Sequence, residues 1–346
     1  MDPPIEHPTP LARAITQLAH GQHLTAEASG AAFDELMAGR ASPGQVAALL
    51  VGLRVLGETE DEIAGAATAL RRAMVPLPGL AHRVDLVDTC GTGGGAVPTF
   101  NISTAAALVA AGAGVPIAKH GNRSFTSKSG SADVFEALGV AIDIAPDRAV
   151  RTLERAGIMF LYAPNFHPAL RHAGPVRREL GIPTVMNLLG PLGNPAGARR
   201  QVVGVADRSR APVLARALAR LGAVHALVVH GEVGMDEVSP VGPTVVWEVR
   251  EGKVSEWTIE PEALGVRGVD LAQLVGGAPA ENAARVERLV RGAVDPAGRA
   301  AVLLNAAAAV YVSEGTRSFS DALGMAARAL DEGQAADRLD RLRADV

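Results

Sequence analysis

Asp88-Thr-Cys-Gly-Thr-Gly-Gly-Gly95 is the stretch on which the predicted fold depends. It follows an apolar run, residues 84–87, and precedes an alanine-rich segment with a polar beginning, residues 101–112. This order predicts a strand, a glycine loop and the first turn of a helix, an arrangement that gathers backbone N–H groups around an anion. The spacing is neither that of a dinucleotide-binding loop nor that of a P-loop, so a tight turn without a ligand is an equal alternative at this point.

Short apolar runs continue to alternate with helical segments after the glycine loop. The runs expected as strands are residues 115–119, 158–162, 202–205 and 226–230. Alternation of this kind is typical of a parallel sheet with helices on its faces. Residues 245–258 contain Glu251-Gly252 between two strand-like runs and predict an antiparallel hairpin. The sequence therefore predicts an α/β fold with a mostly parallel central sheet plus an antiparallel hairpin.

The first part of the chain contains only helical signals. Ser42-Pro-Gly-Gln45 and Thr59-Glu-Asp-Glu62 both match the capping box, in which two side chains satisfy backbone N–H groups at a helix start. We predict a small all-helical domain over residues 1–75, with a later helical contribution near residues 165–190. Residues 82–346 are expected to form the larger α/β domain, after a linker rich in proline.

The bulk composition excludes several classes of protein. The 346 residues carry a formal net charge of −4 and only 3% aromatic residues, which argues against broad nucleic-acid binding and against stacking on single strands. No segment approaches about 18 uninterrupted apolar residues, so no membrane span is expected, and the first residues lack the pattern of a signal peptide. The single cysteine, Cys90, rules out an internal disulfide and favours a cytoplasmic location.

A second polar cluster, residues 119–133, follows the predicted strand 115–119. It contains Lys119 and Lys128, two of the three lysines in the chain, together with an arginine, an amide and several hydroxyls. Open α/β sheets bind ligands where their strands end, and these groups are the usual partners of phosphate oxygens. We therefore favour a phosphate site over a solvated polar loop.

Two further clusters are less specific on their own. Asp236 and Glu237 follow a predicted strand and a glycine turn, and adjacent carboxylates beside a phosphate site suit Mg²⁺, although such a pair in a turn is more often simply solvated. Arg177 could bind a substrate carboxylate through two hydrogen bonds, and a surface salt bridge is at least as probable from spacing alone. The histidines show no spacing of a zinc site.

Taken together, the motifs are recognisable. They are Cys90-Gly-Thr-Gly-Gly94, Asn101-Ile-Ser-Thr104, Lys119-His-Gly-Asn-Arg123, Ser127-Lys-Ser-Gly-Ser-Ala-Asp133, Arg177 in Val-Arg-Arg-Glu-Leu-Gly181, Asn187-Leu-Leu-Gly-Pro-Leu192 and Asp236-Glu-Val-Ser-Pro240. In this order they closely resemble the anthranilate phosphoribosyltransferase family of tryptophan biosynthesis, and the resemblance covers nearly the whole chain.

The resemblance implies a pentosyl transfer. Members move the 5-phosphoribosyl group from phosphoribosyl pyrophosphate (PRPP) to the amine of anthranilate and release pyrophosphate, with Mg²⁺. The implied fold is a helical domain joined to a larger, PRPP-binding α/β domain, and the implied assembly is a homodimer through the helical domain.

The resemblance also implies roles for particular residues. Those implied to bind PRPP are Gly91, Gly94, Gly95, Thr99, Asn101, Ile102, Ser103, Thr104, Lys119, His120, Gly121, Asn122, Arg123, Ser124, Phe125, Thr126, Ser127 and Ser131. Those implied to bind anthranilate or line its path are Gly91, His120, Asn122, His167, Arg177 and Pro191. Those implied to hold magnesium are Ser103, Asp236 and Glu237.

One position departs from the family pattern. Gly95 stands where the family commonly has aspartate, which removes a carboxylate near the ribose and the pyrophosphate.

The chemistry of this transfer predicts no nucleophilic residue and no essential general base, because an aniline nitrogen is neutral at pH 7 and can attack without losing a proton first. Two other functions are considered. A pyrimidine nucleoside phosphorylase would share the architecture and use inorganic phosphate, and the Asp236-Glu237 pair and the run 119–123 favour the transferase over it. A catalytically inactive, nucleic-acid-binding relative is disfavoured by the net charge.

Overall fold

The chain forms two compact units in a computed structural model, which describes residues 8–77, 79–80, 82–95, 97–124, 128–316 and 318–344. The first unit consists of Met1–Val75 and His167–Gly193, and the second of Pro76–Phe166 and Asn194–Val346. None of the helices within the described residues is both long and apolar enough to cross a membrane.

The first unit is all-helical. Its helices are α1 (Pro10–Ala19), α2 (Ala26–Met37), α3 (Pro43–Leu56) and α4 (Glu60–Ala73), followed later in the chain by the 3₁₀-helix η1 (Pro168–His172), α9 (Gly174–Leu180) and α10 (Val185–Leu192). Both predicted capping boxes are present at the starts of α3 and α4. A hydroxyl and a carboxamide or carboxylate thus satisfy backbone N–H groups that a helix start leaves unpaired.

The second unit is built on a seven-stranded sheet in the order β3-β2-β1-β4-β5-β6-β7. The strands are β1 (Val87–Gly91), β2 (Ile117–Gly121), β3 (Ile158–Tyr162), β4 (Arg200–Gly204), β5 (His225–Gly231), β6 (Thr244–Arg250) and β7 (Lys253–Ile259). The first five pair in parallel, and β6 and β7 are antiparallel. Glu251 and Gly252 join β6 to β7 with positive φ angles of 52° and 73°, the pattern of a tight hairpin turn. The predicted α/β fold is confirmed.

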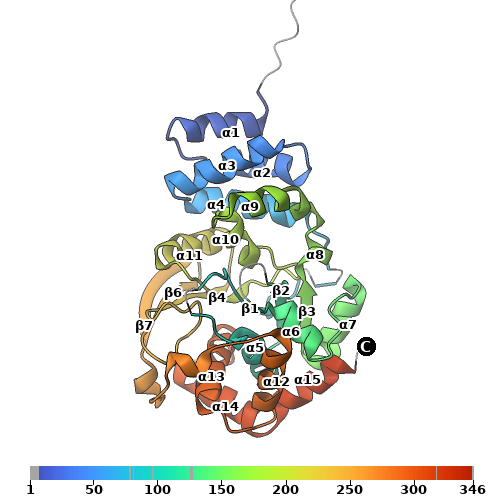
Figure 1. Cartoon of the computed structure of the whole chain (residues 1–346), viewed down its shortest axis with the longest axis vertical. Coiled ribbons are helices and arrows are strands. Elements are labelled where there is room, and N and C mark those ends of the chain that lie inside the picture. Colours follow the sequence, from blue (N-terminus) through green and yellow to red (C-terminus); the bar gives the residue numbers. More distant parts are fainter. Residues whose placement is uncertain are drawn as a thin grey trace, which may run out of the picture. The chain divides into compact units, whose positions relative to one another are not determined.

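The order of the strands reverses direction between β1 and β4. The connection from β1 through α5 (Ile102–Gly112) leads to β2 on one side, and the connection from β4 through α11 (Ala211–Arg220) leads to β5 on the other. Right-handed crossovers in opposite directions place these two helices on opposite faces of the sheet, as Figure 1 shows. Such a reversal is the point at which open α/β sheets bind ligands.

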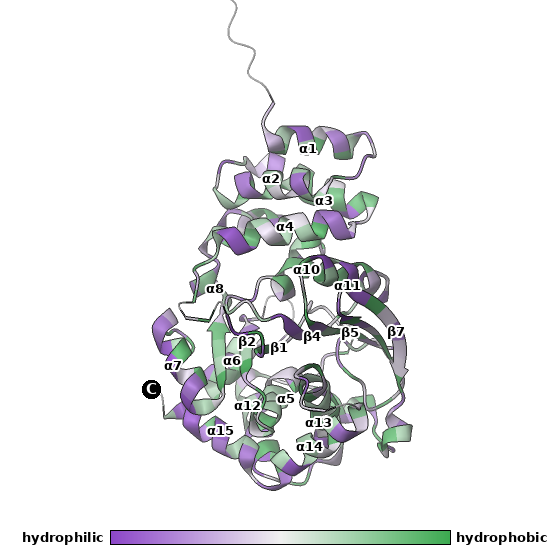
Figure 2. Ribbon diagram, turned by 180° about the vertical axis from the view of Figure 1, so that it is seen from behind, coloured by the Kyte–Doolittle hydropathy of each residue, from purple (hydrophilic) through white to green (hydrophobic). Residues whose placement is uncertain are grey.

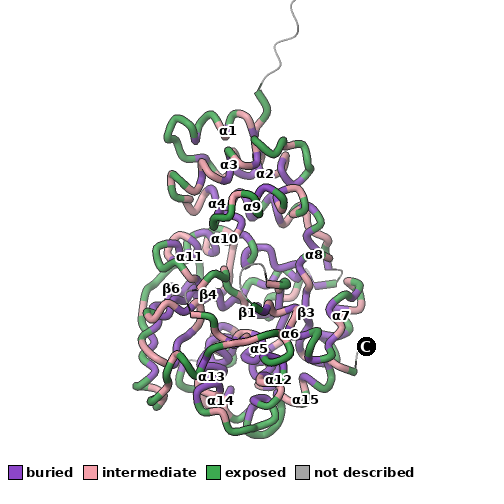
Figure 3. Tube along the Cα trace, in the orientation of Figure 1, coloured by how far each residue is buried: buried purple, intermediate pink, exposed green. Residues whose placement is uncertain are grey.

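Two apolar helices form the core under one face of the sheet. Nearly every residue of α5 and most residues of α13 (Pro296–Val312) are buried, and α13 packs against α5 and against β1, β4 and β5. Figure 2 shows the hydrophobic character of α5 and α13 and the polar residues along α15 (Gln334–Arg343), and Figure 3 shows the exposed residues on the outer helices. The other helices of this unit are α6 (Ser131–Ala137), α7 (Pro146–Ala156), α8 (Ala163–Phe166), α12 (Pro279–Val290), α14 (Phe319–Asp331), η2 (Arg208–Arg210), η3 (Pro261–Leu264) and η4 (Leu271–Leu274).

The first two strands lie further along the chain than their apolar runs predict. The first begins at Val87 rather than at residue 84 and ends at Gly91, and the second covers Ile117–Gly121 rather than 115–119. In both, polar residues continue the strand because partners elsewhere in the fold bury them. The helix α10 continues to Leu192, past residue 190 where the predicted later helical contribution ends, although Gly190 and Pro191 within it are signals that usually end a helix.

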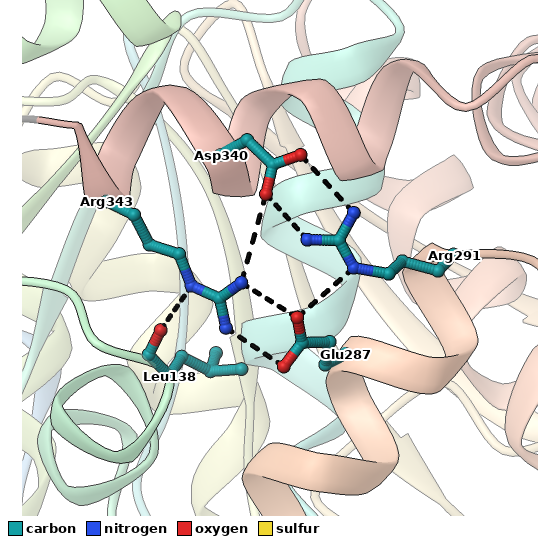
Figure 4. A network of polar contacts seen from close by, with 5 residues as sticks. All are labelled: Leu138, Glu287, Arg291, Asp340 and Arg343. Atoms are coloured by element: carbon teal, nitrogen blue, oxygen red, sulfur yellow. Dashed lines mark hydrogen bonds and ion pairs between the residues drawn. The ribbon is translucent and has the colours of Figure 1, made fainter.

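A network of ion pairs joins α12 to α15 (Figure 4). Glu287 accepts hydrogen bonds from both terminal nitrogens of Arg343, at 2.7 and 2.9 Å, and one from Arg291 Nε at 3.1 Å. Arg291 also pairs with Asp340, and Arg343 donates to the carbonyl oxygen of Leu138. The hydrogen bond from Arg343 and then that from Arg291 lower the pKa of Glu287 to about 2.

We expect this network to stabilise the second unit at neutral pH and to weaken in acid. Because the folded-state pKa of Glu287 lies below its ordinary value of 4.5, its contribution is complete above about pH 4.5 and is lost as the pH falls towards 2. Glu287→Gln should lower the free energy of unfolding at pH 7 by about 1 kcal/mol, a value reduced for partial exposure of the carboxylate.

Urea denaturation at pH 7 and at pH 4 measures this effect. The difference between the wild-type protein and Glu287→Gln should shrink at the lower pH, whereas Glu256→Gln, a change of an exposed carboxylate on β7, should have little effect at either pH. A difference that stays constant with pH would contradict this assignment.

Candidate functional site

The parallel strands around the reversal point all end in glycine. They end at Gly91, Gly121, Gly204 and Gly231. Without side chains at these positions, other backbone segments can approach the carboxyl edge of the sheet closely. The candidate site lies at this edge, within the second unit.

The loop after β5 lies directly on the end of β4. A Cβ atom at Gly204 would stand 1.7 Å from the carbonyl oxygen of Asp236, so only glycine fits there. A Cβ atom at Gly91 would stand 3.3 Å from Oδ2 of the Asp236 carboxylate, and one at Gly95 would stand 2.7 Å from Oδ1. The Asp236 side chain therefore lies against the glycine loop (residues 91–95), although Asp236 follows Gly95 by 141 positions in the sequence.

Lys119, on β2, lies next to β1 and is 1% exposed. Its ammonium group donates to the carbonyl and hydroxyl oxygens of Thr89 and to the hydroxyl of Ser103. Burial lowers the pKa of Lys119, and the nearby charges of Asp88, Cys90 and Glu237 oppose that shift. The lysine thus connects β1, β2 and the first turn of α5, and it places a positive charge under the site.

Within the acidic pair, the charge of Asp236 disfavours the ionisation of Glu237. Burial, and then the charge of Asp236, raise the pKa of Glu237 to about 8, while Lys119 and a hydrogen bond from the backbone N–H of Ser103 act in the opposite direction. Burial also raises the pKa of Asp236. A small cavity beside Glu237 is lined by Thr89, Cys90, Ser103, Gly204 and Asn305, among others.

This donor set fits a hard divalent cation. Two partly buried carboxylates that repel each other would be neutralised by such an ion, and Ser103 supplies a further oxygen nearby. The described residues contain no group of three or more His, Cys, Asp and Glu side chains suited to a metal ion. The set accordingly fits Mg²⁺, which usually binds through one or two carboxylates and completes its shell with phosphate and water, better than zinc.

The buried carboxylate of Asp88, whose role the sequence did not indicate, holds β2 and Asn194 in place beside the site. Asp88 is fully buried on β1, accepts a hydrogen bond from the backbone N–H of His120 at 3.1 Å and another from Asn194 Nδ2 at 2.8 Å. Asn194 also donates to the carbonyl oxygen of Ala118, so it joins β1 to β2. Burial raises the pKa of Asp88 to about 6, although Asn194 and then Lys119 favour its ionised form.

Within the polar cluster 119–133, Arg123 contacts acidic side chains of α6 and the ring of Tyr162. Its guanidinium pairs with Asp133 at 2.9 Å and with Glu136 at 2.8 Å, and lies 5.8 Å from the centre of the Tyr162 ring. Asp133 also accepts a hydrogen bond from the backbone N–H of Ser124. Arg123 therefore fastens the start of this loop to α6.

The remaining predicted residues of the second unit surround the same edge of the sheet. Asn101 precedes the first residue of α5, and its side chain donates to the carbonyl oxygen of Ser129 and accepts from Asn282 Nδ2. Gly121 packs against Ser131 at the start of α6, and Asn122 accepts a hydrogen bond from the backbone N–H of Arg123. The other predicted positions are Gly94 with φ +81°, Thr99 in an isolated bridge to Val275, and the buried Ile102 and Thr104 at the start of α5. Phe125, Thr126 and Ser127 lie outside the described residues.

Three predicted residues belong to the first unit. His167 is buried and donates from Nε2 to the carbonyl oxygen of Gly193 at 2.8 Å, and burial lowers its pKa to about 4. Pro191 is buried inside α10. Arg177 on α9 is partly buried, and burial lowers its pKa. Its guanidinium makes no hydrogen bond or ion pair with the described residues, which leaves its donors available for a carboxylate.

Comparison with known proteins shows which family both units resemble. The model of the glycosyl transferase family, a/b domain, matches residues 83–336, and that of the helical bundle domain of the same family matches residues 12–74. The anthranilate phosphoribosyltransferase of Thermomicrobium roseum is 50% identical over 332 residues, which are 95% of either chain.

Two solved structures are similar over almost their full length. The crystal structure of anthranilate phosphoribosyltransferase from Thermus thermophilus matches with a TM-score of 0.90 and 43% identity, over 96% of this chain and 98% of that one. The same enzyme from Saccharomyces cerevisiae, in complex with PRPP and Mg, matches with a TM-score of 0.86 and 30% identity over 97% of both chains.

The close approach of Asp236 to Gly204 makes a direct prediction. Gly204→Ala should displace the segment around Asp236, and overpacking of this kind should lower the free energy of unfolding by about 1–3 kcal/mol. Hydrogen exchange should become faster in residues 231–239.

Gly324→Ala on α14 is the matched control, because the nearest atom to its added Cβ would be the end of the flexible Arg328 side chain at 3.7 Å. This control should be neutral or stabilising by up to about 1 kcal/mol, since alanine favours a helix over glycine. Equal effects of the two substitutions would show that Gly204 is not under steric constraint.

Proposed function

The chain belongs to the anthranilate phosphoribosyltransferases, within the glycosyl transferase family, and we propose that it transfers the 5-phosphoribosyl group of PRPP to the amine of anthranilate in tryptophan biosynthesis. The products are N-(5-phosphoribosyl)anthranilate and pyrophosphate. The observation that carries the proposal is the convergence of the glycine loop, Ser103, Lys119 and the pair Asp236–Glu237 at the reversal point of the sheet.

PRPP would bind to the second unit. Backbone N–H groups of the glycine loop and of the first turn of α5 suit phosphate oxygens, because both present unpaired donors and the helix start adds a favourable dipole. Lys119 uses its donors on Thr89 and Ser103, so it contributes through its charge and by holding Ser103 in place.

Asp236, Glu237 and Ser103 would hold Mg²⁺, which supplies charge neutralisation for the diphosphate when it is bound. The support is the donor set itself, two repelling carboxylates beside a hydroxyl. Gly95 adds no carboxylate to this set where the family commonly has aspartate, and its lack of a side chain leaves room for Asp236.

The reaction breaks the bond between C1 of the ribose and the pyrophosphate oxygen, and the electron pair leaves with pyrophosphate. The positive charge of Lys119 and the N–H groups of the loop stabilise the negative charge that develops there, which is commonly the largest catalytic contribution. The neutral amine of anthranilate forms the new C1–N bond and then loses a proton, for which His120 or water is sufficient. The chain needs neither a nucleophile nor an essential general base for this sequence.

Anthranilate would be oriented through its carboxylate by Arg177, whose donors have no partner among the described residues. Fixing the amine relative to C1 removes translational and rotational freedom, which can lower a barrier by up to roughly 7–11 kcal/mol. Roles for Gly91, Asn122, His167 and Pro191 along the path of anthranilate stay predictions from the resemblance.

Two further parts of the proposal concern the cell and the assembly. The single cysteine suits a cytoplasmic location. The family resemblance predicts a homodimer through the helical domain of residues 1–75, and light scattering on the purified protein would measure its mass.

The decisive assay mixes the protein with PRPP, anthranilate and Mg²⁺ and follows the loss of anthranilate fluorescence. We expect turnover that depends on both substrates. Phosphorolysis of pyrimidine nucleosides with inorganic phosphate, or a salt-dependent shift of DNA without transfer, would instead support one of the two other functions.

The acidic pair can be tested by substitution. Asp236→Asn combined with Glu237→Gln should lower kcat by at least about a hundredfold at every practical Mg²⁺ concentration, because the charge that balances the metal is lost. Glu232→Gln is the control, since this exposed residue of the same loop pairs with Arg208 and lies outside the proposed site. Near-normal turnover of the double variant would remove the metal assignment.

Arg177 makes a separate prediction. Arg177→Ala should raise the KM for anthranilate by roughly ten- to a hundredfold with little change in the KM for PRPP, because a charge-assisted pair contributes about 1.5–3 kcal/mol. Arg178→Ala, which removes the exposed neighbour on α9, should leave both constants near those of the wild-type protein. An unchanged KM for anthranilate in Arg177→Ala would argue against the carboxylate contact.

A further inference from the structure

The helix α13 contains one polar side chain deep in its apolar surface. Asn305 is 3% exposed and is followed by four alanines, Ala306 to Ala309, that are fully buried. A buried amide is costly unless its donors and acceptor are hydrogen-bonded, so its partners indicate why an asparagine occupies this position.

The partners of Asn305 are on the loop that carries the acidic pair. Its Oδ1 accepts from the backbone N–H of Val238 at 2.9 Å, and its Nδ2 donates to the backbone carbonyl of Val238 at 2.9 Å. A third bond, from Nδ2 to the carbonyl oxygen of Ala301, fixes the side chain to its own helix. The carboxamide therefore matches both polar groups of one backbone residue, as a neighbouring strand would.

Val238 is fully buried and directly follows Glu237. The bonds at Val238 consequently fix the direction in which the chain leaves the acidic pair. On the other side of the pair, the backbone of Met235 is bridged to Gly231, and the carbonyl oxygen of Asp236 rests on Gly204. Asn305 fixes the backbone on the C-terminal side of Glu237, through its two hydrogen bonds to Val238.

The helix that carries Asn305 is held in place by the core of the second unit. α13 packs against β1, β4 and β5 and against α5, the helix whose first turn contains Ser103. Asn305 also lines the small cavity that Ser103 and Glu237 share. Its contact with Val238 therefore sets the position of the acidic pair relative to Ser103 and to the ends of β1 and β4.

We infer that Asn305 is a positioning residue for the metal-binding carboxylates, acting through the backbone of Val238 to hold Asp236 and Glu237 towards Ser103 and the glycine loop. This inference rests on the proposed function, because it assigns Asn305 a task in binding the magnesium complex of PRPP. Asn305 itself touches neither substrate nor metal in this role.

The carboxamide has no equivalent among the other side chains of its size. Leucine or alanine would leave the N–H and carbonyl groups of Val238 buried without partners. Aspartate could accept from the N–H group but would direct an oxygen at the carbonyl groups of Val238 and Ala301. The loop would then move to regain hydrogen bonds, and the carboxylates would move with it.

The test compares the Mg²⁺ dependence of three proteins, the wild type, Asn305→Ala and the control Val310→Ala, which removes packing from the same helix and leaves the hydrogen bonds between Asn305 and Val238 in place. Transfer to anthranilate is measured over a range of Mg²⁺ concentrations. The affinity for PRPP in the absence of anthranilate is measured by calorimetry at low and at saturating Mg²⁺, which gives a readout independent of turnover.

We expect Asn305→Ala to require roughly tenfold more Mg²⁺ for half-maximal rate, the usual scale for residues that orient metal ligands. Its affinity for PRPP should be weaker than wild type at low Mg²⁺ and should recover at saturating Mg²⁺, with the KM for anthranilate unchanged. Val310→Ala should keep the wild-type Mg²⁺ dependence. Asn305→Ser, which keeps a polar group at this position but is one bond shorter than the carboxamide, is measured in the same way and replaces Asn305→Ala as the test variant if Asn305→Ala does not fold.

An unshifted Mg²⁺ requirement in a folded Asn305 variant would overturn the inference, as would an equal shift in Val310→Ala. A wild-type protein that transfers nothing to anthranilate would instead reject the proposed function, so the two failures can be told apart.

Discussion

The carbonyl oxygen of Asp236 lies where a side chain at position 204 would begin, and the rest of the site depends on this close approach to Gly204. The end of β4 must be free of a side chain for the loop after β5 to cross it. Once the loop lies there, the Asp236 carboxylate contacts the glycine loop after β1, and Glu237 reaches the first turn of α5. The reversal of strand order between β1 and β4 provides the opening in which this happens.

Three buried carboxyl groups and one buried lysine gather at this edge of the sheet, and their charges do not fully neutralise one another. Asp88, Asp236 and Glu237 all have raised pKa values because they are withdrawn from water, while Lys119 is a buried cation whose pKa is lowered for the same reason. Buried charges of this kind are unfavourable without partners. A divalent cation with a diphosphate would supply balancing charges of both signs, which explains why this arrangement of side chains suits such a complex.

The sequence predicted those parts of the fold that depend on neighbouring residues. The capping boxes of α3 and α4 and the turn at Glu251-Gly252 are local signals, and the structure contains all of them. The ends of β1 and β2 were misplaced because Asp88, Thr89 and His120 are polar and yet buried. Asp88 and Thr89 have their partners on β2, about 30 residues away in the sequence.

The supporting residues of the site could not be predicted for the same reason. Asn194 lies 106 residues from its partner Asp88, and Asn305 lies 67 residues from Val238, so nothing near either asparagine in the sequence indicates its contacts. A single asparagine within the otherwise apolar run of residues 300–310 was the available signal for Asn305. The family resemblance named the loops and the acidic pair as one site, and the fold brings these elements of the second unit to one edge of the sheet.

The central claim is that two loops and the acidic pair form one binding site for a metal diphosphate. A crystal structure with PRPP and Mn²⁺ in place of Mg²⁺ tests it directly, because manganese is located by its anomalous scattering. The account predicts a manganese peak within bonding distance of the Asp236 or Glu237 carboxylate, with the diphosphate against the glycine loop. A diphosphate bound elsewhere, or manganese with no contact to either carboxylate, would contradict it.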